Sequence, residues 1–227
     1  MRGKRILVFA AIALLLTGQF SPACGQDVKG LIRSIDEQQR KIETITALFV
    51  QKKETSLVKM PLLSSGLVRF KRPDLIHWNY AEPEPMEVAI SGKGIWIYHP
   101  GSLQAEKYYL GRNKRMTQSL EPLLAIFQKT FHQLSDDYAI IYGGLETEHI
   151  HHFSLHPRDE KVRKFLSRVD LWIDKTSGAI IRFKMVEANG DRLNLEFKNL
   201  QINPPLTDDD LKIKIPPSVR VWEQSTP

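Results

Sequence analysis

Apolar and polar residues alternate along most of this chain, which is the pattern of β-strands that bury one face. The alternation is clearest between Gly66 and Pro100, where Ile76, Trp78 and Tyr80 fall on one face of a single strand. Short strands joined by tight turns predict an antiparallel meander. The residues that form these turns are Pro73-Asp74, the Pro83 and Pro85 pair, Ser91-Gly92-Lys93-Gly94, and Pro100-Gly101-Ser102.

The same pattern predicts about eleven strands in the whole chain. An Asn189-Gly190 pair between two of them is a strong signal for a hairpin turn. The expected strands cover Ala47–Lys52, Leu63–Lys71, Leu75–Tyr80, Met86–Ser91, Ile95–His99, Leu103–Leu110, Tyr138–Tyr142, His149–His156, Phe165–Asp174, Ala179–Glu187 and Arg192–Leu200, with a short run at Leu211–Ile215.

Two stretches have helical periodicity instead. From Val28 to Ile45 apolar residues recur every three or four positions, which predicts an amphipathic helix. A second helix is expected over Ser119–Leu134, with Ser119 as its cap and Pro122 in its first turn. The predicted fold is mainly β (α+β): one strongly curved antiparallel sheet that forms an incomplete barrel, with an N-terminal helix and a lid helix over its open side. Such a sheet can enclose an apolar cavity.

The first 25 residues have the features of a cleaved signal peptide. Arg2, Lys4 and Arg5 precede an apolar run of about 11 residues, shorter than the roughly 20 that span a bilayer. Ala23 and Gly25 give the small-x-small pair for cleavage, whereas Cys24 allows a second interpretation as a lipidated residue. Cleavage after Gly25 leaves one domain, residues 26–227, in the periplasm, without the chain's only cysteine.

Composition and motifs argue against several kinds of function. The chain carries a formal charge of +6, and loss of the three signal-peptide cations leaves 29 basic and 26 acidic residues. No dense basic stripe with aromatics suggests nucleic acid, and no catalytic or phosphate-binding motif suggests an enzyme or a cofactor. Two imidazoles on one strand face could meet a metal, but zinc needs four ligands, so we expect a solvent-facing polar strand and no metal site. The histidines concerned are His149, His151, His152 and His156.

A set of motifs resembles the LolA family of periplasmic outer-membrane lipoprotein carriers. Its hallmark segment is matched by Arg72-Pro73-Asp74, Trp78, Ser91-Gly92-Lys93 and Trp96-Ile97-Tyr98-His99-Pro100. Weaker matches are Phe49-Val50-Gln51-Lys52, Pro122-Leu123-Leu124-Ala125-Ile126 and Ile215-Pro216-Pro217-Ser218-Val219. The resemblance extends over nearly the whole mature chain. The apolar spacer Glu54–Leu63 departs from the family pattern, and this departure bears on the cavity mouth and the cargo.

The resemblance implies a monomeric carrier that encloses the acyl chains of lipoproteins. Its expected partners are acylated lipoproteins, an inner-membrane lipoprotein-releasing ABC transporter and an outer-membrane lipoprotein acceptor. By the same resemblance, Arg72 latches the lid with its guanidinium. Carriage of another lipid, or a periplasmic lipid-binding sensor, is the alternative. The residues expected to line the cavity are Ile45, Phe49, Ile76, Trp78, Leu123, Leu124 and Phe127.

Overall fold

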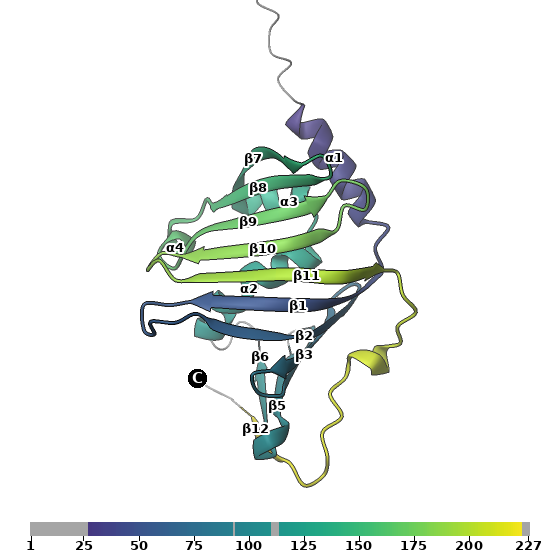
Figure 1. Ribbon diagram of the computed structural model, residues 1–227, viewed down its shortest axis with the longest axis vertical. Coiled ribbons are helices and arrows are strands. Elements are labelled where there is room, and N and C mark those ends of the chain that lie inside the picture. The colour runs from purple at the N-terminus through teal and green to yellow at the C-terminus, as the bar shows by residue number, and fades with distance from the viewer. Residues whose placement is uncertain (1–26, 93, 110–113, 224–227) are drawn as a thin grey trace, which may run out of the picture.

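The computed structural model describes residues 27–92, 94–109 and 114–223. In these ranges twelve strands form one sheet, in the order β12-β6-β5-β4-β3-β2-β1-β11-β10-β9-β8-β7 (Figure 1). The strands are β1 Thr44–Glu54, β2 Leu62–Lys71, β3 Leu75–Glu82, β4 Met86–Ser91, β5 Gly94–His99, β6 Gln104–Tyr109, β7 Tyr138–Thr147, β8 Ile150–Pro157, β9 Leu166–Asp174, β10 Ile180–Glu187, β11 Arg192–Ile202 and β12 Arg220–Glu223. The helices are α1 Val28–Gln39, α2 Lys114–Gln128, α3 Phe131–Asp137 and α4 Glu160–Arg163, with 3-10 turns η1 Pro100–Ser102 and η2 Asp208–Leu211. The expected signal peptide and Cys24 lie outside the described residues.

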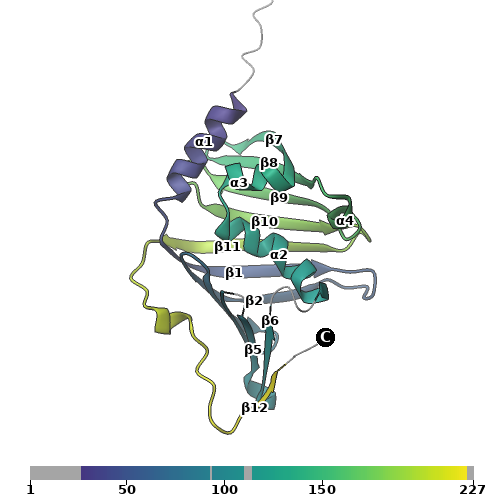
Figure 2. The same ribbon diagram turned by 180° about the vertical axis from the view of Figure 1, so that it is seen from behind.

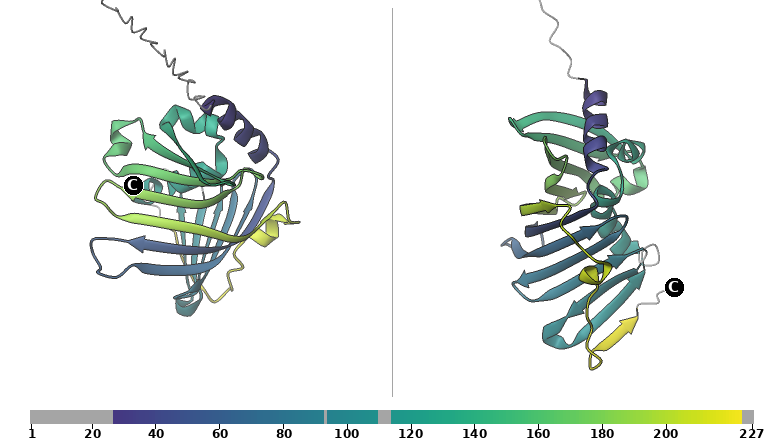
Figure 3. Two further views of the ribbon diagram at one scale, coloured as in Figure 1. Left: turned by 45° about the horizontal axis from the view of Figure 1, so that its top comes forward. Right: turned by 90° about the vertical axis from the view of Figure 1, so that its right-hand side faces the viewer.

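Two antiparallel meanders meet at the centre of the sheet. One runs from β1 to β6 and the other from β7 to β11, and β1 pairs with β11 with Phe49 opposite Phe197. The sheet is strongly curved and its helices cover one face (Figure 3). The prediction of a single strongly curved sheet with helices over one side is therefore confirmed, and its strands pair in antiparallel fashion except at β12.

The end of the chain differs from the prediction. No strand forms over Leu211–Ile215; a 3-10 turn ends at Leu211. Ile213 and Ile215 then pack against a small buried cluster of Tyr98, Ala105 and Val219, on the face of the sheet that the helices leave uncovered. The last strand is β12 instead, which pairs with β6 in parallel and so breaks the all-antiparallel pattern. The alternating apolar residues of this segment are buried like those of a strand, but its backbone pairs with no other strand.

The helix boundaries also differ from the prediction. The first helix ends at Gln39, and Ile45 lies on β1. The second stretch divides into α2 and α3, with Ser119 inside α2 rather than at its cap, and Pro122 inside the helix rather than in its first turn. Thr130 restarts the helix through a capping box with the side chain of Gln133, which explains the break.

The inner face of the sheet carries the main core. α2 and α3 lie across this face (Figure 2). Side chains of both meanders form one buried cluster with residues of α1, α2 and α3. The C-terminal segment crosses part of the outer face instead, where a cavity of about 560 Å³ lies between Leu75, Trp96 and Ile213.

Candidate apolar site beneath the covering helices

The side of α2 that faces the sheet is apolar. Leu123, Leu124, Ala125 and Ile126 are buried, and Phe127 is partly buried. Among the side chains of α2 that the structure describes, those from Leu120 onward, no hydrogen bond or ion pair to the sheet is recorded. Apolar packing therefore holds this part of α2 to the sheet.

Phe127 lies at the centre of an aromatic cluster. Its ring centroid is 5.6 Å from that of Phe70, 5.7 Å from that of Trp78 and 6.2 Å from that of Phe197. Trp78 in turn meets Phe49 edge-on at 6.3 Å. These rings come from β1, β2, β3 and β11, so one side chain of α2 bridges both meanders.

All seven residues expected to line a cavity lie in or against this one cluster. They fill the space between α2 and the sheet. The opening recorded beside the C-terminal end of α2 has a volume of only about 40 Å³ and is lined in part by Ile42, Ile45 and Phe127. The described arrangement is therefore closed at the expected lining residues, where a ligand cavity would require α2 to move away from the sheet. A separate cavity of about 290 Å³ beside α2 is lined in part by charged residues, among them Glu121 and Arg158.

Tyr80 on β3 packs against the aromatic cluster and places a hydroxyl group beside its apolar side chains. Its hydroxyl donates to Oε1 of Gln51 at 3.1 Å, and its ring meets that of Phe49 edge-on. Burial raises the pKa of Tyr80 to about 12, so the phenol stays neutral over the physiological range.

Arg72 follows β2 and reaches the end of the first helix. Its Nε donates to the carbonyl oxygen of Ile42 at 2.6 Å, and its Nη2 donates to that of Gln39 at 2.7 Å. The carbonyl end of a helix attracts a cation, and the guanidinium can engage several carbonyls at once. The recorded partners of Arg72 thus belong to α1 and its connection to β1, whereas the resemblance implied the lid helix.

A buried acid, Asp36, connects α1 to the rest of the cover. It is only 4% exposed. Its Oδ1 accepts from the backbone N–H of Phe131 at 2.6 Å and its Oδ2 from that of His132 at 3.1 Å. A carboxylate at the first N–H groups of α3 satisfies donors that a helix leaves free. Helical periodicity did not single out this residue as functional, although an acid four positions after Ile32, on the apolar stripe of an amphipathic helix, was a signal in the sequence.

α1 is tied to the sheet at its other side as well. Nε2 of Gln39 donates to the carbonyl of Gly178 at 3.0 Å, and Nε2 of Gln38 donates to that of Lys175 at 3.3 Å. Gly178 has φ of +72°, and a Cβ there would lie 2.8 Å from that of Gln38. Hydrogen bonds therefore connect Arg72 to α1, and Asp36 connects α1 to α3. Because α3 follows α2 directly in the chain, these contacts also restrain the end of α2.

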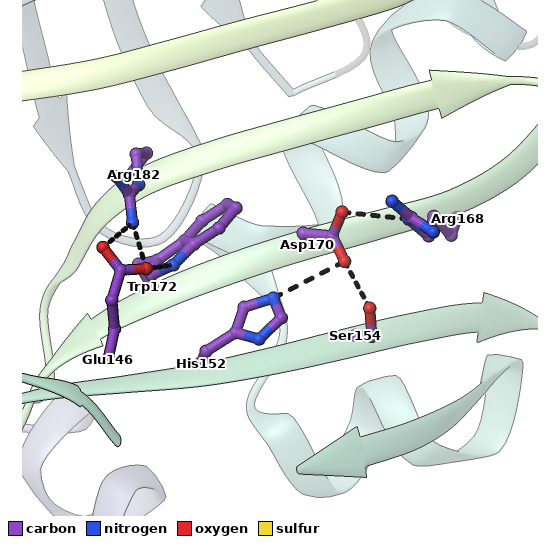
Figure 4. A network of polar contacts seen from close by, with 7 residues as sticks. All are labelled: Glu146, His152, Ser154, Arg168, Asp170, Trp172 and Arg182. Carbon is purple, nitrogen blue, oxygen red and sulfur yellow. Dashed lines mark hydrogen bonds and ion pairs between the residues drawn. The ribbon is translucent and has the colours of Figure 1, made fainter. Parts of the chain in front are cut away.

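A polar network occupies the outer face of β7 to β10 (Figure 4). The carboxylate of Glu146 accepts from Nη2 of Arg182 at 2.6 and 2.5 Å, and also from the indole N–H of Trp172. The guanidinium of Arg182 stacks on the Trp172 ring at 4.0 Å, and His152 stacks on the other side of this ring system at 4.7 Å. Asp170 is buried and accepts from Nε of Arg168 at 3.0 Å.

The histidines are placed differently from the expected solvent-facing strand. His151 is buried and points to the inner face, where its Nδ1 lies 3.0 Å from the Tyr142 hydroxyl, while His152 lies on the outer face. His149 precedes β8 and sits in a turn. In the described part of the chain, no group of three or more histidine, cysteine or acidic side chains could hold a metal ion.

We expect Glu146→Gln to lower the free energy of unfolding by less than about 1 kcal/mol, because exposed ion pairs contribute little. Arg182 holds the pKa of the Glu146 carboxyl below its usual range, but both side chains are more than a third exposed. Urea denaturation of the variant and the wild type at neutral pH measures this difference. A loss of several kcal/mol would show that the network, rather than the apolar core, stabilises this half of the sheet.

The geometry is that of an open, curled sheet whose inner face is closed by helices. Similarity to known proteins agrees with it: a family profile described as "Outer membrane lipoprotein carrier protein LolA" matches residues 40–214. The chain belongs to the LolA family.

Curated relatives cover almost its whole length. A Pseudomonas aeruginosa PAO1 protein named outer-membrane lipoprotein carrier protein is 26% identical over 226 residues, which are 99% of this chain and 100% of that protein. A protein of the same name from Erwinia tasmaniensis is 28% identical over 195 residues, 83% of this chain and 87% of that protein.

Solved structures share the fold at low sequence identity. An uncharacterised conserved protein from Thermus thermophilus superposes with a TM-score of 0.55 at 13% identity, over 88% of this chain and 100% of that one. MucB superposes with a TM-score of 0.51 at 15% identity, over 83% of this chain and 63% of that one. None of the helices in the described ranges is both long and apolar enough to cross a membrane.

Proposed function

We propose that this protein carries lipoproteins through the periplasm with their acyl chains enclosed between α2 and the inner face of the sheet. The observation that carries the proposal is the contact of α2: its described side chains meet the sheet through apolar groups, above an aromatic cluster of both meanders. The described part of α2 can therefore lift without breaking hydrogen bonds between its side chains and the sheet. The family and the names of its curated relatives support the same cargo.

The physical need for such a carrier follows from the cargo. Each buried methylene is stabilised by about 0.8 kcal/mol, so a lipoprotein with several acyl chains does not leave a membrane unaided. A carrier must therefore replace the bilayer with an apolar surface and still release the chains. The closed cluster suits this, because its aromatic side chains cover one another when the protein is empty and become available when α2 moves.

Each residue expected at the site has a proposed part in this cycle. Arg72 holds the cover closed through α1, since its two hydrogen bonds fix the end of that helix. The acyl chains would replace the contacts that the covering helix makes with the sheet. The proposed lining is Ile45, Phe49, Ile76, Trp78, Leu123, Leu124 and Phe127.

We further propose that the protein works as a monomer between two membrane partners. It would accept lipoproteins from an inner-membrane ABC transporter and pass them to an outer-membrane acceptor. The reaction is transfer of bound cargo, so the proposal requires no catalytic residue, cofactor or metal. This role agrees with the carrier family to which the chain belongs.

Native mass spectrometry of protein purified from the periplasm without detergent, followed by lipid extraction, tests the proposal. The expected result is one triacylated lipoprotein per protein, released when the purified outer-membrane acceptor is added. A different bound lipid would contradict lipoprotein carriage and leave a carrier of that lipid. A protein that is always empty and binds no acyl probe would contradict carriage altogether and favour a sensor.

A further inference from the structure

The turn between β1 and β2 exposes an unusual number of large apolar side chains. Leu57 is 88% exposed and Met60 is 78% exposed, and Val58, Leu62 and Leu63 beside them are exposed as well. Single exposed apolar residues are ordinary, but several on one turn mark an interaction surface. We call residues 55–63 the tip; it projects from one side of the sheet (Figure 1).

The backbone of the tip is held in place although its side chains are free. The N–H of Ser56 donates to Oδ1 of Asp191, on the neighbouring β10–β11 turn, at 3.0 Å. This hydrogen bond is the main cause that lowers the pKa of the Asp191 carboxyl. The N–H of Val58 donates to the carbonyl of Thr55 at 3.4 Å and closes the turn. The apolar side chains are thus presented by an ordered turn, and they do not fold back onto the sheet.

Positive charge surrounds the tip. Lys52, Lys53 and Lys59 lie on or beside it, and Glu54 is the one acid between residues 52 and 63. Glu54 is already paired, with Lys52 at 2.6 Å and with Arg192 at 3.8 Å. Acids at the same end of the sheet lie on other elements: Asp191 binds the tip backbone, Glu187 ends β10 beside it, and Glu82 is on β3 opposite Ser65.

We propose that the tip inserts its apolar side chains into the interface of an anionic phospholipid bilayer. The shape favours a bilayer over a protein groove, because the apolar side chains stand out from the apex of a turn and form no flat or concave face. Apolar side chains enter the boundary between headgroups and acyl chains, and adjacent lysines meet anionic headgroups. Leu57 and Met60 would insert, and Lys59 between them and Lys53 behind them would meet the headgroups, whereas Lys52 is already paired with Glu54.

The position of the tip gives its membrane contact a role in cargo transfer, and this role rests on the proposed function. In the β1–β2 pairing, Thr44 and Lys71 face each other at one end, next to Arg72, and Lys53 and Leu62 face each other at the other end. Ten residues of strand rise about 33 Å, so the tip and Arg72 lie at opposite ends of the hairpin. Phe49 lies between them on β1. A tip inserted in a bilayer would therefore bring the end of the apolar site remote from the latch to the membrane surface.

Sedimentation with vesicles tests the proposal. The exported protein, in a Cys24→Ala background that excludes attachment through that residue, is mixed with vesicles of phosphatidylethanolamine and phosphatidylglycerol. We expect it to sediment with them, and we expect the double variant L57S/M60S to bind roughly tenfold more weakly. The matched control is I141S/L145S, which removes two exposed apolar side chains from β7 at the far edge of the sheet. It should bind like the wild type.

Three results would overturn the proposal. The first is failure of the wild-type protein to sediment, and the second is equal binding by L57S/M60S. The third is equal binding to vesicles of phosphatidylcholine alone, which would exclude the anionic bilayer as the occupant. If L57S/M60S binds vesicles like the wild type yet takes up less cargo from the purified transporter, the tip contacts a protein instead.

A second measurement shows directly what the tip contacts. Leu57→Cys in the same background carries one environment-sensitive fluorophore, and Leu145→Cys is its control. We expect a blue shift on addition of anionic vesicles for position 57 only. Empty vesicles contain no cargo, and acyl-probe binding is measured separately in solution. If the wild-type protein binds the acyl probe but not the vesicles, the tip proposal is refuted and the proposed function stands. If it binds the vesicles but no acyl probe, the proposed function is refuted and the tip proposal stands.

Discussion

Replacement of Arg72 by leucine is expected to slow delivery of lipoprotein to the outer-membrane acceptor by at least about tenfold. The guanidinium makes two charge-assisted hydrogen bonds, to the carbonyls of Gln39 and Ile42. Hydrogen bonds to a charged group contribute about 1.5–3 kcal/mol each, and these two are partly buried, while about 1.4 kcal/mol corresponds to a tenfold change in an equilibrium. They exist in the closed, empty protein, so they favour release of the chains. Without them the loaded protein is favoured and cargo is trapped.

The measurement is the rate at which loaded protein transfers a labelled lipoprotein to the purified acceptor, together with affinity for an acyl probe. Probe affinity should rise as transfer slows. Arg72→Lys keeps the charge but loses the fork of donors and should be intermediate. Lys71→Leu is the matched control, because the neighbouring ammonium pairs with Asp208 at 2.7 Å, away from α1. Transfer at the normal rate by the Arg72→Leu protein would show that the latch assignment is wrong.

Replacement of Asp36 by alanine should lower the free energy of unfolding by about 2 kcal/mol, because it leaves the buried N–H of Phe131 without a partner and frees that of His132. The same change removes the connection between α1 and α3. We therefore expect looser closure as well as lower stability. Urea denaturation measures the loss of stability, and hydrogen exchange of the amides in α2 and α3 measures the looser closure.

Asp36→Asn retains one acceptor oxygen and should recover part of the loss. Thr130→Ala is a useful comparison, since it removes the N-cap of the same helix without touching α1. If Asp36→Ala changes stability but leaves exchange of the α2 amides as in the Thr130→Ala protein, Asp36 is a structural cap and has no part in closing the cover.

The sheet was predictable because alternation is a local property that survives in each strand. The helix and strand boundaries that were predicted wrongly depend on contacts between residues far apart in the sequence. Ile213 and Ile215 alternate like a strand but pack against a cluster that includes Tyr98 and Ala105, more than a hundred positions earlier. α2 and α3 separate because Thr130 and Gln133 form a capping box that the continuous apolar pattern conceals. Periodicity alone cannot distinguish these cases.

The site was predictable to a different degree. The expected lining residues fall in one cluster because strand and helix periodicity places them on buried faces, yet their contact with acyl chains stays a prediction. The partners of Arg72 and the role of Asp36 depend on where the end of α1 meets α3, and no local pattern gives that arrangement. The apolar residues of the tip were visible in the sequence as a departure from the family pattern. The exposure of their side chains was not.

The pairing of β1 with β11 constrains how the chain reaches this structure. Ile45 lies opposite Ile202, so the centre of the sheet joins residues more than 150 positions apart. Contacts of such long separation form late and slowly. Until β11 has emerged, the edge of β1 has no partner strand and the ring of Phe127 lacks its contact with Phe197. If the protein is exported from its N-terminus as proposed, the two meanders can join only after nearly all of the chain has crossed the membrane, and holding chaperones would protect the unpaired edge until then.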